Sequence, residues 1–398
     1  MREKNQNQPA RSSREAQNNV TVKSQKKKKK GGLLGRLVRR FFLLLFTLIF
    51  LVVGSLVAIM YTVFNGPSPA ARDVLTMSLL EPSATKWIPG LFLGDELVEQ
   101  IRADQGTELT DDVSDSSQVV INRGDTLSTG GDEWANYPDG IRIESYGGKT
   151  FNAHIMIVRD PSRVYMAMST EKWSTSIPGT RINQQIETEG AIAAINAGAF
   201  LDNGTAGPEV GSVPSGIVYA QGAFRSNSYR EYLQESGFAG FNQDDVLIVA
   251  KNMTVEQANE LGIRDGCEFG PVLIMNGEVN DVAYNSNSGF NPRTAIGQRA
   301  DGAVIFLCID GRQPGSVGGT YRDCIDIMVE YGAVNACNMD GGSSSVMLYN
   351  DVDGRYADRD YHDIDSSETV KMVNNYSVLQ SKPRRMPNFW MVRPASEG

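Results

Sequence analysis

The sequence predicts a mixed α/β domain with a substantial mixed sheet and flanking helices, preceded by one transmembrane helix. Three observations predict this class. Residues 41–64 carry no charge, the chain changes to short β-rich runs after about residue 148, and a helical pattern separates two apolar runs within residues 303–339. With 398 residues, 41% of them hydrophobic and 21% charged, the chain has the composition of a folded protein and room for one large domain plus extra segments.

The first element is the apolar run at residues 41–64, FFLLLFTLIFLVVGSLVAIMYTVF. As a helix it would be about 36 Å long, enough to cross a hydrocarbon core of about 30 Å with some tilt. It has no polar stripe, whereas a buried helix of a soluble protein usually has one. The alternative is a cleaved signal peptide, with Ser68-Pro69-Ala70 as a weak cleavage site. The run exceeds the usual apolar segment of a signal peptide, about 7–15 residues, so an uncleaved anchor is favoured.

The charge distribution predicts the orientation of this span. Residues 1–40 hold 13 Lys and Arg against Glu3 and Glu15, a net charge of +11, and residues 41–398 carry −20. The positive-inside rule therefore keeps the tail in the cytoplasm and places residues 65–398 outside the cell membrane. The run Lys26 to Lys30 can bind anionic lipid. An acidic external part is not built to bind nucleic acid.

The segment after the span, residues 65–145, is predicted to be a membrane-proximal stalk or linker. Its acidic stretch at 104–132 has no apolar periodicity. The folded domain is predicted to occupy residues 146–398. It opens with two apolar runs, 151–158 and 163–169, that are expected to form a hairpin across Asp160-Pro161-Ser162.

Later in the domain, a strand, a helix and a strand follow one another. The apolar run 303–310 comes first, Thr320 is a typical N-cap for the next helix, Gly332 ends it, and AVNACNM follows at 333–339. In a right-handed crossover the two strands end at the same edge of a sheet, where open α/β sheets gather their sites.

Cysteine and histidine usage limits the chemistry. The spacing of the four cysteines is not that of a zinc site, and the sequence is compatible both with disulfides and with buried thiols. The only histidines are His154 and His362, which argues against His-rich metal sites. His154 falls on a predicted strand and is read as a core or edge residue rather than a catalytic one.

Polar residues cluster where four apolar runs end. Any one of these segments would pass for an ordinary turn or a solvated surface residue, but together they predict a site. The candidate residues are Asn196, Arg293, Thr294, Asp310, Arg312, Asp340, Gly341, Gly342 and Ser343.

These residue types suit a negatively charged sugar derivative. We expect Asp340 and Asp310 to be catalytic, because a carboxylate can act as a nucleophile or general base at an anomeric carbon. Asp310 has a second reading, in which it orients Arg312 or holds its turn. Arginine offers a bidentate fork to phosphate, and a Gly-Gly-Ser turn can form an anion-binding nest. No obligatory cofactor is expected. Calcium or magnesium on one of the carboxylates is a possible variant, with metal ligands otherwise unassigned.

Five motifs in this order resemble the phosphodiester glycosidase family. They are INAGAF, GPVLIMNGE, NPRTAIG, DGRQPGSVGGT and ACNMDGGSSSVM, and the resemblance covers roughly residues 146–396. The family's Asp-Gly-Gly-Ser falls on Asp340 to Ser343, its Asp-Gly-Arg on Asp310 to Arg312, and its Asn-Pro-Arg-Thr on Asn291 to Thr294. Its usual Asn-Gly-Gly-Phe-Phe appears here as Asn196 to Phe200 with two alanines, which changes the first loop.

The resemblance implies a phosphodiester glycosidase-like domain that hydrolyses the bond between a sugar C1 and its phosphate, in a carbohydrate phosphodiester or surface polysaccharide. It also implies a cell-envelope role, since bacterial members are often labelled as exopolysaccharide-related. It does not assign the two carboxylates. Two other functions remain open, namely a non-catalytic module that binds anionic glycan and a metal-dependent phosphodiesterase that cuts the P–O bond.

Overall fold

The computed structural model describes residues 33–80, 85–103, 112–121, 133–201, 210–233, 237–356, 361–364, 369–375 and 382–395. The chain divides into two compact units, residues 1–59 and 60–398. The basic tail up to residue 32 lies outside the described residues, and so does most of the acidic stretch 104–132. Lipid binding by the tail therefore stays a prediction.

A single long helix, α1 (Leu33–Phe64), covers the apolar run and starts ahead of it. The segment Gly35–Phe64 is long and apolar enough to cross a membrane, and a signal sequence near an N-terminus has the same properties. The helix begins before residue 41 because leucines and arginines, which are good helix formers, precede the uncharged run.

Seven further helices lie in the second unit, within the residues that the structure describes. They are α2 (Pro69–Leu80), α3 (Ile88–Leu93), α4 (Asp95–Ala103), α5 (Ile182–Glu189), α6 (Val255–Glu260), α7 (Asp281–Asn285) and α8 (Tyr321–Glu330). Short 3-10 helices occur at η1 (Ser116–Gln118), η2 (Pro161–Arg163), η3 (Arg230–Tyr232) and η4 (Gly342–Ser344).

The largest sheet has seven strands in the order β1-β2-β16-β15-β17-β13-β14, and each described neighbour pair is antiparallel. Its strands are β1 (Ile141–Gly147), β2 (Asn152–Val158), β13 (Val272–Met275), β14 (Glu278–Val279), β15 (Arg293–Arg299), β16 (Val304–Ile309) and β17 (Ala333–Met339). The mixed α/β class that the sequence predicted is confirmed.

Two other sheets complete the core. The six-stranded sheet has the order β19-β20-β18-β5-β22-β3, and the five-stranded sheet has the order β11-β10-β12-β8-β9. Their strands are β3 (Val164–Met168), β5 (Ala193–Asn196), β8 (Gly216–Ala220), β9 (Ala223–Ser228), β10 (Phe238–Asn242), β11 (Leu247–Ala250), β12 (Ile263–Glu268), β18 (Met347–Asn350), β19 (His362–Asp363), β20 (Val370–Met372) and β22 (Asn388–Val392). Two short ladders pair β4 (Thr180–Arg181) with β21 (Arg385–Met386) and β6 (Phe200–Leu201) with β7 (Val213–Pro214).

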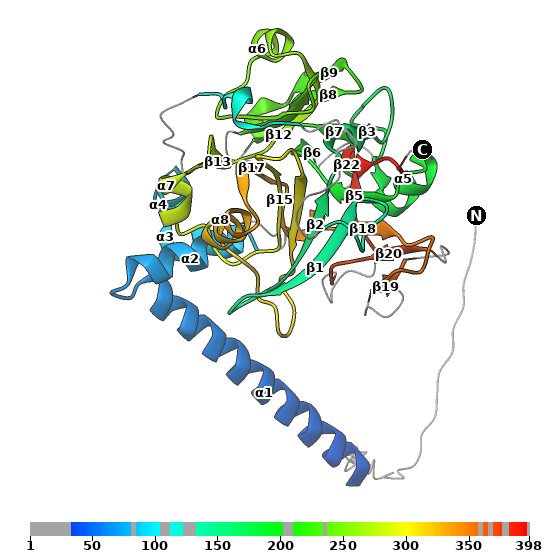
Figure 1. Cartoon of the computed structure of the whole chain (residues 1–398). Coiled ribbons are helices and arrows are strands. Elements are labelled where there is room, and N and C mark those ends of the chain that lie inside the picture. The colour runs from blue at the N-terminus through cyan, green and yellow to red at the C-terminus, as the bar shows by residue number, and fades with distance from the viewer. Residues whose placement is uncertain are drawn as a thin grey trace, which may run out of the picture. The chain divides into compact units, whose positions relative to one another are not determined.

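The seven-stranded sheet separates two cores. On one face its side chains pack against the six- and five-stranded sheets, and on the other they pack against α8. Figure 1 shows α8 beside the strands of this sheet. Alternation along the strands produces this division, since Phe306 and Cys308 of β16 enter the first core while Ile305 and Leu307 enter the second. None of the four cysteines forms a disulfide, and all four are buried in these cores, so they act as small apolar side chains.

The predicted strand–helix–strand unit is present as β16, α8 and β17. Thr320 and Asp323 form a capping box at the start of α8, and Gly332, with φ +80, follows its end. β15 runs between β16 and β17 and is antiparallel to both, so these two strands are parallel but not neighbours.

The predicted hairpin is wrong, although both of its strands exist. β2 pairs with β1 and β16 in the seven-stranded sheet, whereas β3 pairs with β22 in the six-stranded sheet. The 3-10 turn at Pro161–Arg163 carries the chain from one sheet to the other. Both strands are buried on nearly every residue, hence on two faces, and such a continuous apolar run is equally compatible with a hairpin and with two separate sheets.

Part of the segment predicted as a stalk, residues 65–145, belongs to the folded unit. α4 buries Val98 and Ile101, and Val119 packs in the core under the five-stranded sheet. β1, which starts at Ile141, lies ahead of the predicted domain boundary and pairs along its length with β2. The polar composition concealed this because each short helix buries only one or two side chains.

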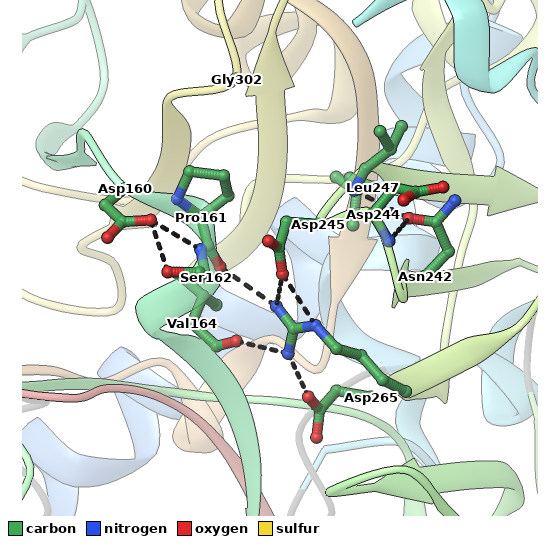
Figure 2. Close-up of polar contacts among 12 residues, drawn as sticks. Asp160, Pro161, Ser162, Val164, Asn242, Asp244, Asp245, Leu247, Asp265 and Gly302 are labelled. Carbon is green, nitrogen blue, oxygen red and sulfur yellow. Dashed lines mark hydrogen bonds and ion pairs between the residues drawn. The ribbon is translucent and has the colours of Figure 1, made fainter. Parts of the chain in front are cut away.

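One arginine, Arg264 on β12, joins the five-stranded sheet to the six-stranded sheet (Figure 2). Its guanidinium group contacts the carboxylates of Asp245 and Asp265, at 3.1 Å in the first pair. It also donates to the backbone oxygens of Val164 at 2.8 Å and Pro161 at 3.1 Å. The other carboxylate oxygen of Asp265, Oδ1, accepts the backbone N–H groups of Met166 and Gln221. Both oxygens of Asp265 therefore have hydrogen-bond partners.

Candidate functional site

The predicted site residues come together at one edge of the seven-stranded sheet. Arg293 and Thr294 open β15, Asp310 follows the end of β16, and Asp340 follows the end of β17. Because β15 is antiparallel to both neighbours, its first residues face the last residues of β16 and β17. Asn196, at the end of β5, reaches the same edge from the six-stranded sheet.

The two predicted catalytic carboxylates lie on strands that are separated by β15. Neighbouring strands are about 4.8 Å apart, so β16 and β17 are about 9.6 Å apart. In register, Ile309 pairs with Arg293, and Thr294 pairs with Met339, so Asp310 lies one residue further along the edge than Asp340. The geometry therefore does not favour a closely spaced carboxylate pair.

Asn196 holds three segments of the site together. It is 0% exposed, and its side-chain N–H donates to the backbone oxygen of Asp340 at 2.6 Å. Its side-chain oxygen accepts the hydroxyl of Thr294 at 2.8 Å and the N–H of Val346 at 3.1 Å. Ala197 adds a backbone bond, since its oxygen accepts the N–H of Asp340 at 3.0 Å. These contacts position the start of the Asp-Gly-Gly-Ser turn.

The carboxylate of Asp310 is engaged by protein donors. It is 1% exposed and accepts the backbone N–H of Asn375 at 2.9 Å and that residue's side-chain N–H at 3.2 Å. The ring Nε2 of His154 lies 3.3 Å from its second oxygen, and the ring Nδ1 has no hydrogen-bond partner among the described residues. Sequence reasoning missed both partners. Asn375 lies outside the five motifs.

This environment is a poor fit for a cation at Asp310, because N–H donors point at the oxygens that would have to ligate it. Among the described residues, no group of three or more His, Cys, Asp and Glu side chains is arranged to hold a metal ion.

Arg293 is buried, and its guanidinium group donates hydrogen bonds to backbone oxygens of neighbouring loops. The side chain is 1% exposed and donates to the backbone oxygens of Ser288 at 2.6 Å, Gly289 at 3.2 Å and Gly319 at 3.2 Å. It also lies over the ring of Tyr321, 4.4 Å from the centroid. These contacts give the residue a positioning role at this edge.

Arg312 differs, since it is half-buried and directed at the glycine turn. Its backbone has φ +57, a strained conformation for a residue with a side chain. Its guanidinium group donates to Asn291 Oδ1 at 3.1 Å and lies 3.1 Å from the point where a Cβ on Gly342 would stand. Gly342 itself has φ +61, and a Cβ on Gly341 would stand 2.8 Å from the Pro292 oxygen. The two glycines thus let the turn approach both neighbours.

A second arginine, Arg384, reaches the same turn. It donates to the hydroxyl of Ser343 at 3.1 Å and lies over the ring of Phe200, 5.0 Å from the centroid. Sequence reasoning missed it, because it lies outside the five motifs, although within the roughly 146–396 region that the resemblance covers. The half-buried groups at this edge are therefore Asp340, the glycine turn and two guanidinium groups.

The helix α2 supports the site from the N-terminal side. Ser78 Oγ accepts the backbone N–H of Phe290 at 2.9 Å and donates to the Val74 oxygen at 2.7 Å. A Cβ on Gly289, with φ +75, would stand 2.6 Å from the Ser78 nitrogen. The loop that α2 contacts is the one whose backbone oxygens accept hydrogen bonds from Arg293, so α2 helps to hold the site in place.

A buried carboxylate, Glu268, lies behind the first site loop. Its backbone oxygen accepts the N–H of Ala199 at 3.0 Å. Its carboxylate accepts the N–H of Ile217 at 2.8 Å and pairs with Arg230 at 2.9 Å. Burial raises the pKa of Glu268 from its ordinary value, and the Ile217 and Arg230 contacts offset only part of that rise.

We expect the pH dependence of stability to change when Glu268 is replaced by Gln. Because the pKa of Glu268 is raised in the folded state, the folded protein binds the carboxyl proton more tightly than the unfolded chain does. The contribution of Glu268 to stability therefore falls as pH rises above about 4.5. Urea unfolding at several pH values should show wild-type stability falling relative to Glu268→Gln across that range. A constant difference between the two proteins would contradict the expectation.

The comparisons with known proteins agree with the motifs at this edge. The family model described as phosphodiester glycosidase matches residues 189–393, which include every candidate residue above except those on β2 and α2. A protein of Bacillus subtilis (strain 168), the SPbeta prophage-derived protein YomE, is 30% identical over 176 residues. This match covers 42% of the present chain and 25% of the relative, so the chain spans about a quarter of that protein.

Two solved structures are similar to this chain. The catalytic domain of zebrafish N-acetylglucosamine-1-phosphodiester alpha-N-acetylglucosaminidase, auto-inhibited by its pro-peptide, is 16% identical with a TM-score of 0.49. That match covers 64% of this chain and 82% of the zebrafish chain. A hypothetical protein from Synechocystis is 15% identical with a TM-score of 0.39, covering 64% and 62% of the two chains. The family model spans more than half of the 398 residues, and the chain belongs to the phosphodiester glycosidase family.

Proposed function

We propose that this protein is a membrane-anchored, extracytoplasmic hydrolase that cleaves the glycosidic C–O bond of sugar-1-phosphate diesters in a surface glycan or glycopolymer. The observation that carries the proposal is the convergence of the family's motifs at one sheet edge, where a half-buried carboxylate and two guanidinium groups surround a glycine turn. This set suits an anionic sugar derivative better than a neutral one.

In the proposed reaction Asp340 takes the proton from a water molecule that attacks the sugar C1. The C1–O bond breaks, and its electrons leave with the phosphate monoester. Asp340 is assigned this role because it is half-buried and within reach of a substrate, whereas Asp310 is only 1% exposed. We assign Asp310 to positioning, through His154 and Asn375. A phosphate monoester is a better leaving group than a sugar alkoxide, so arginine neutralisation can replace strong general-acid help.

Of the predicted phosphate ligands, Arg312 and the Gly341–Ser343 turn are proposed to bind substrate directly, together with Arg384. Asn196, Arg293 and Thr294 are buried, and their polar groups bind other parts of the protein. We propose that they hold the turn in place.

The test is product analysis on a panel of synthetic sugar-1-phosphate diesters in ¹⁸O water. Label in the sugar would mean C–O cleavage and support the proposal. Label in the phosphate would mean P–O cleavage and identify a phosphodiesterase instead. Binding of these diesters without turnover of any of them would identify a non-catalytic glycan-binding module.

We expect Arg312→Lys to raise KM by about tenfold to 100-fold, because losing a bidentate, charge-assisted contact costs about 1.5–3 kcal/mol. Arg293→Lys should instead lower thermal stability, since several backbone oxygens depend on its fork. Steady-state kinetics and thermal melts on both variants make the comparison. Wild-type KM in Arg312→Lys would remove that residue from phosphate binding.

The proposed topology keeps residues 41–64 in the mature protein, with residues 1–40 in the cytoplasm and residues 65–398 outside. Its basis is the net charge of +11 before the apolar run and −20 from residue 41 onward. Protease added to intact cells should remove the C-terminal domain and spare the tail. A secreted form that starts near Ala71 would show that the run is a cleaved signal.

A further inference from the structure

The end of the apolar helix is tied to a short helix with an exposed apolar face. Phe64, the last residue of α1, is 2% exposed, and its ring stacks on that of Phe92 in α3 with the centroids 5.0 Å apart. On the outside of the same short helix, Leu91 is 70% exposed and Trp87, its N-cap, is 61% exposed. Residues four apart lie on one face of a helix, so Trp87 and Leu91 form a single apolar surface.

We propose that this surface, Trp87 and Leu91, docks into the interfacial layer of the bilayer that α1 crosses. The inference rests on the membrane anchor proposed above but not on the hydrolytic activity. Tryptophan is enriched at membrane interfaces, where its ring meets acyl chains and its N–H meets headgroups. Two large exposed apolar side chains at this point fit a lipid surface.

The depth of α3 follows from its contacts. Phe64 marks the end of the apolar run, and Tyr61, one turn earlier, is 61% exposed as expected of an aromatic residue near the interface. α3 has six residues and is therefore about 9 Å long, so the docking surface lies within about 10 Å of Phe92. The headgroup region of each leaflet is about 5–8 Å thick. The proposal places Trp87 and Leu91 in the headgroup layer because Leu91 adjoins Phe92, whose ring stacks on the last residue of the apolar helix.

The same helices hold α3 in this position and connect it to the site. Thr85 Oγ1 donates to the Leu79 oxygen of α2 at 2.9 Å, and the Ile88 N–H donates to the Thr85 oxygen at 2.9 Å. α2 in turn binds the loop at Phe290 through Ser78. α2 has 12 residues, about 18 Å, so a docked α3 would keep the site loop within a few nanometres of the bilayer. Substrates would then be glycan phosphodiesters close to the membrane.

The experiment is tryptophan quenching in the full-length protein, inserted through α1 into nanodiscs that contain lipids brominated near the glycerol end of the acyl chain. Insertion of α1 is checked first by protease protection. The chain has four tryptophans, and Trp390 is fully buried. We expect wild-type emission to be quenched, Trp87→Phe to remove that quenching, and the matched control Trp173→Phe to retain it.

A second variant keeps the fluorophore and tests the surface itself. Leu91→Glu places a charge on an exposed position and should reduce the quenching of Trp87 while leaving the fold unchanged. Equal quenching in wild type and Trp87→Phe would overturn the proposal, and so would no quenching in the inserted wild-type protein. Because the readout involves no hydrolysis, a protein that is inactive on every diester can still show docking, and an active one can fail to show it.

Discussion

Replacing Asp340 with Asn should reduce kcat by about 10²- to 10⁴-fold, the range expected when a proton-transfer carboxylate is lost. Asp340 is half-buried just after the end of β17. Hydrogen bonds with Ala197 and Asn196 hold its backbone, and they do not involve its carboxylate. Asparagine has nearly the same shape, so we expect the fold and the melting temperature to stay close to wild type. Turnover of a sugar-1-phosphate diester and a thermal melt are the two measurements.

A matched control for this change is Asp353→Asn, because the Asp353 side chain is 74% exposed and its contact with Arg355 is long, at 3.9 Å. It removes the same charge from the chain at a position outside the site. Near-wild-type turnover in Asp340→Asn would exclude the catalytic role. An equal loss of activity in both variants would point to net charge rather than to a reacting group.

Replacing Arg264 with Met should destabilise the folded unit by about 3–5 kcal/mol, because it leaves two carboxylates without their cation at a buried position. The side chains of Asp245 and Asp265 are 10% and 1% exposed. The change also removes donors from the backbone oxygens of Val164 and Pro161, which join the two smaller sheets. Methionine fills similar volume, so the loss is electrostatic and not a cavity effect.

Urea unfolding measures this effect, and Arg322→Met provides the control. Arg322 is exposed, stacks on the ring of Tyr284 at 4.6 Å and donates to that residue's backbone oxygen at 3.0 Å, so its loss should cost less than about 1 kcal/mol. A double variant, Arg264→Met with Asp265→Asn, should recover part of the stability, because one of the stranded charges is removed with its partner. An Arg264→Met protein as stable as wild type would show that the cluster contributes nothing net.

Local pattern was sufficient to place many elements of this protein. An uncharged run of 24 residues indicated α1, and short apolar runs indicated β2, β16 and β17. A Thr N-cap and a terminal Gly indicated α8. These signals depend on residues close together in the chain, and the sequence carries them directly. The order of five polar motifs also identified the family, which the family model confirms.

Pairing between strands was beyond such reasoning. β15 lies between β16 and β17, and β2 and β3 belong to different sheets, although the strand patterns themselves were read correctly. The residue pattern of a strand that is buried on both faces does not indicate which strand it pairs with, because any apolar neighbour would bury it equally well. The spacing of Asp310 and Asp340 followed from that pairing and could not be read in advance.

The sequence by itself determined the apolar helix, the charge asymmetry, the family and the positions of Asp340 and Arg312. Only the tertiary structure decided which distant polar groups contact one another at and around the site. It brought His154 to Asp310, Arg384 to Ser343 and Ser78 to Phe290, pairs that are 156, 41 and 212 residues apart in the chain. The physical reason is that side-chain chemistry and local periodicity are properties of short segments, whereas contacts between distant segments depend on how all the sheets and helices pack together.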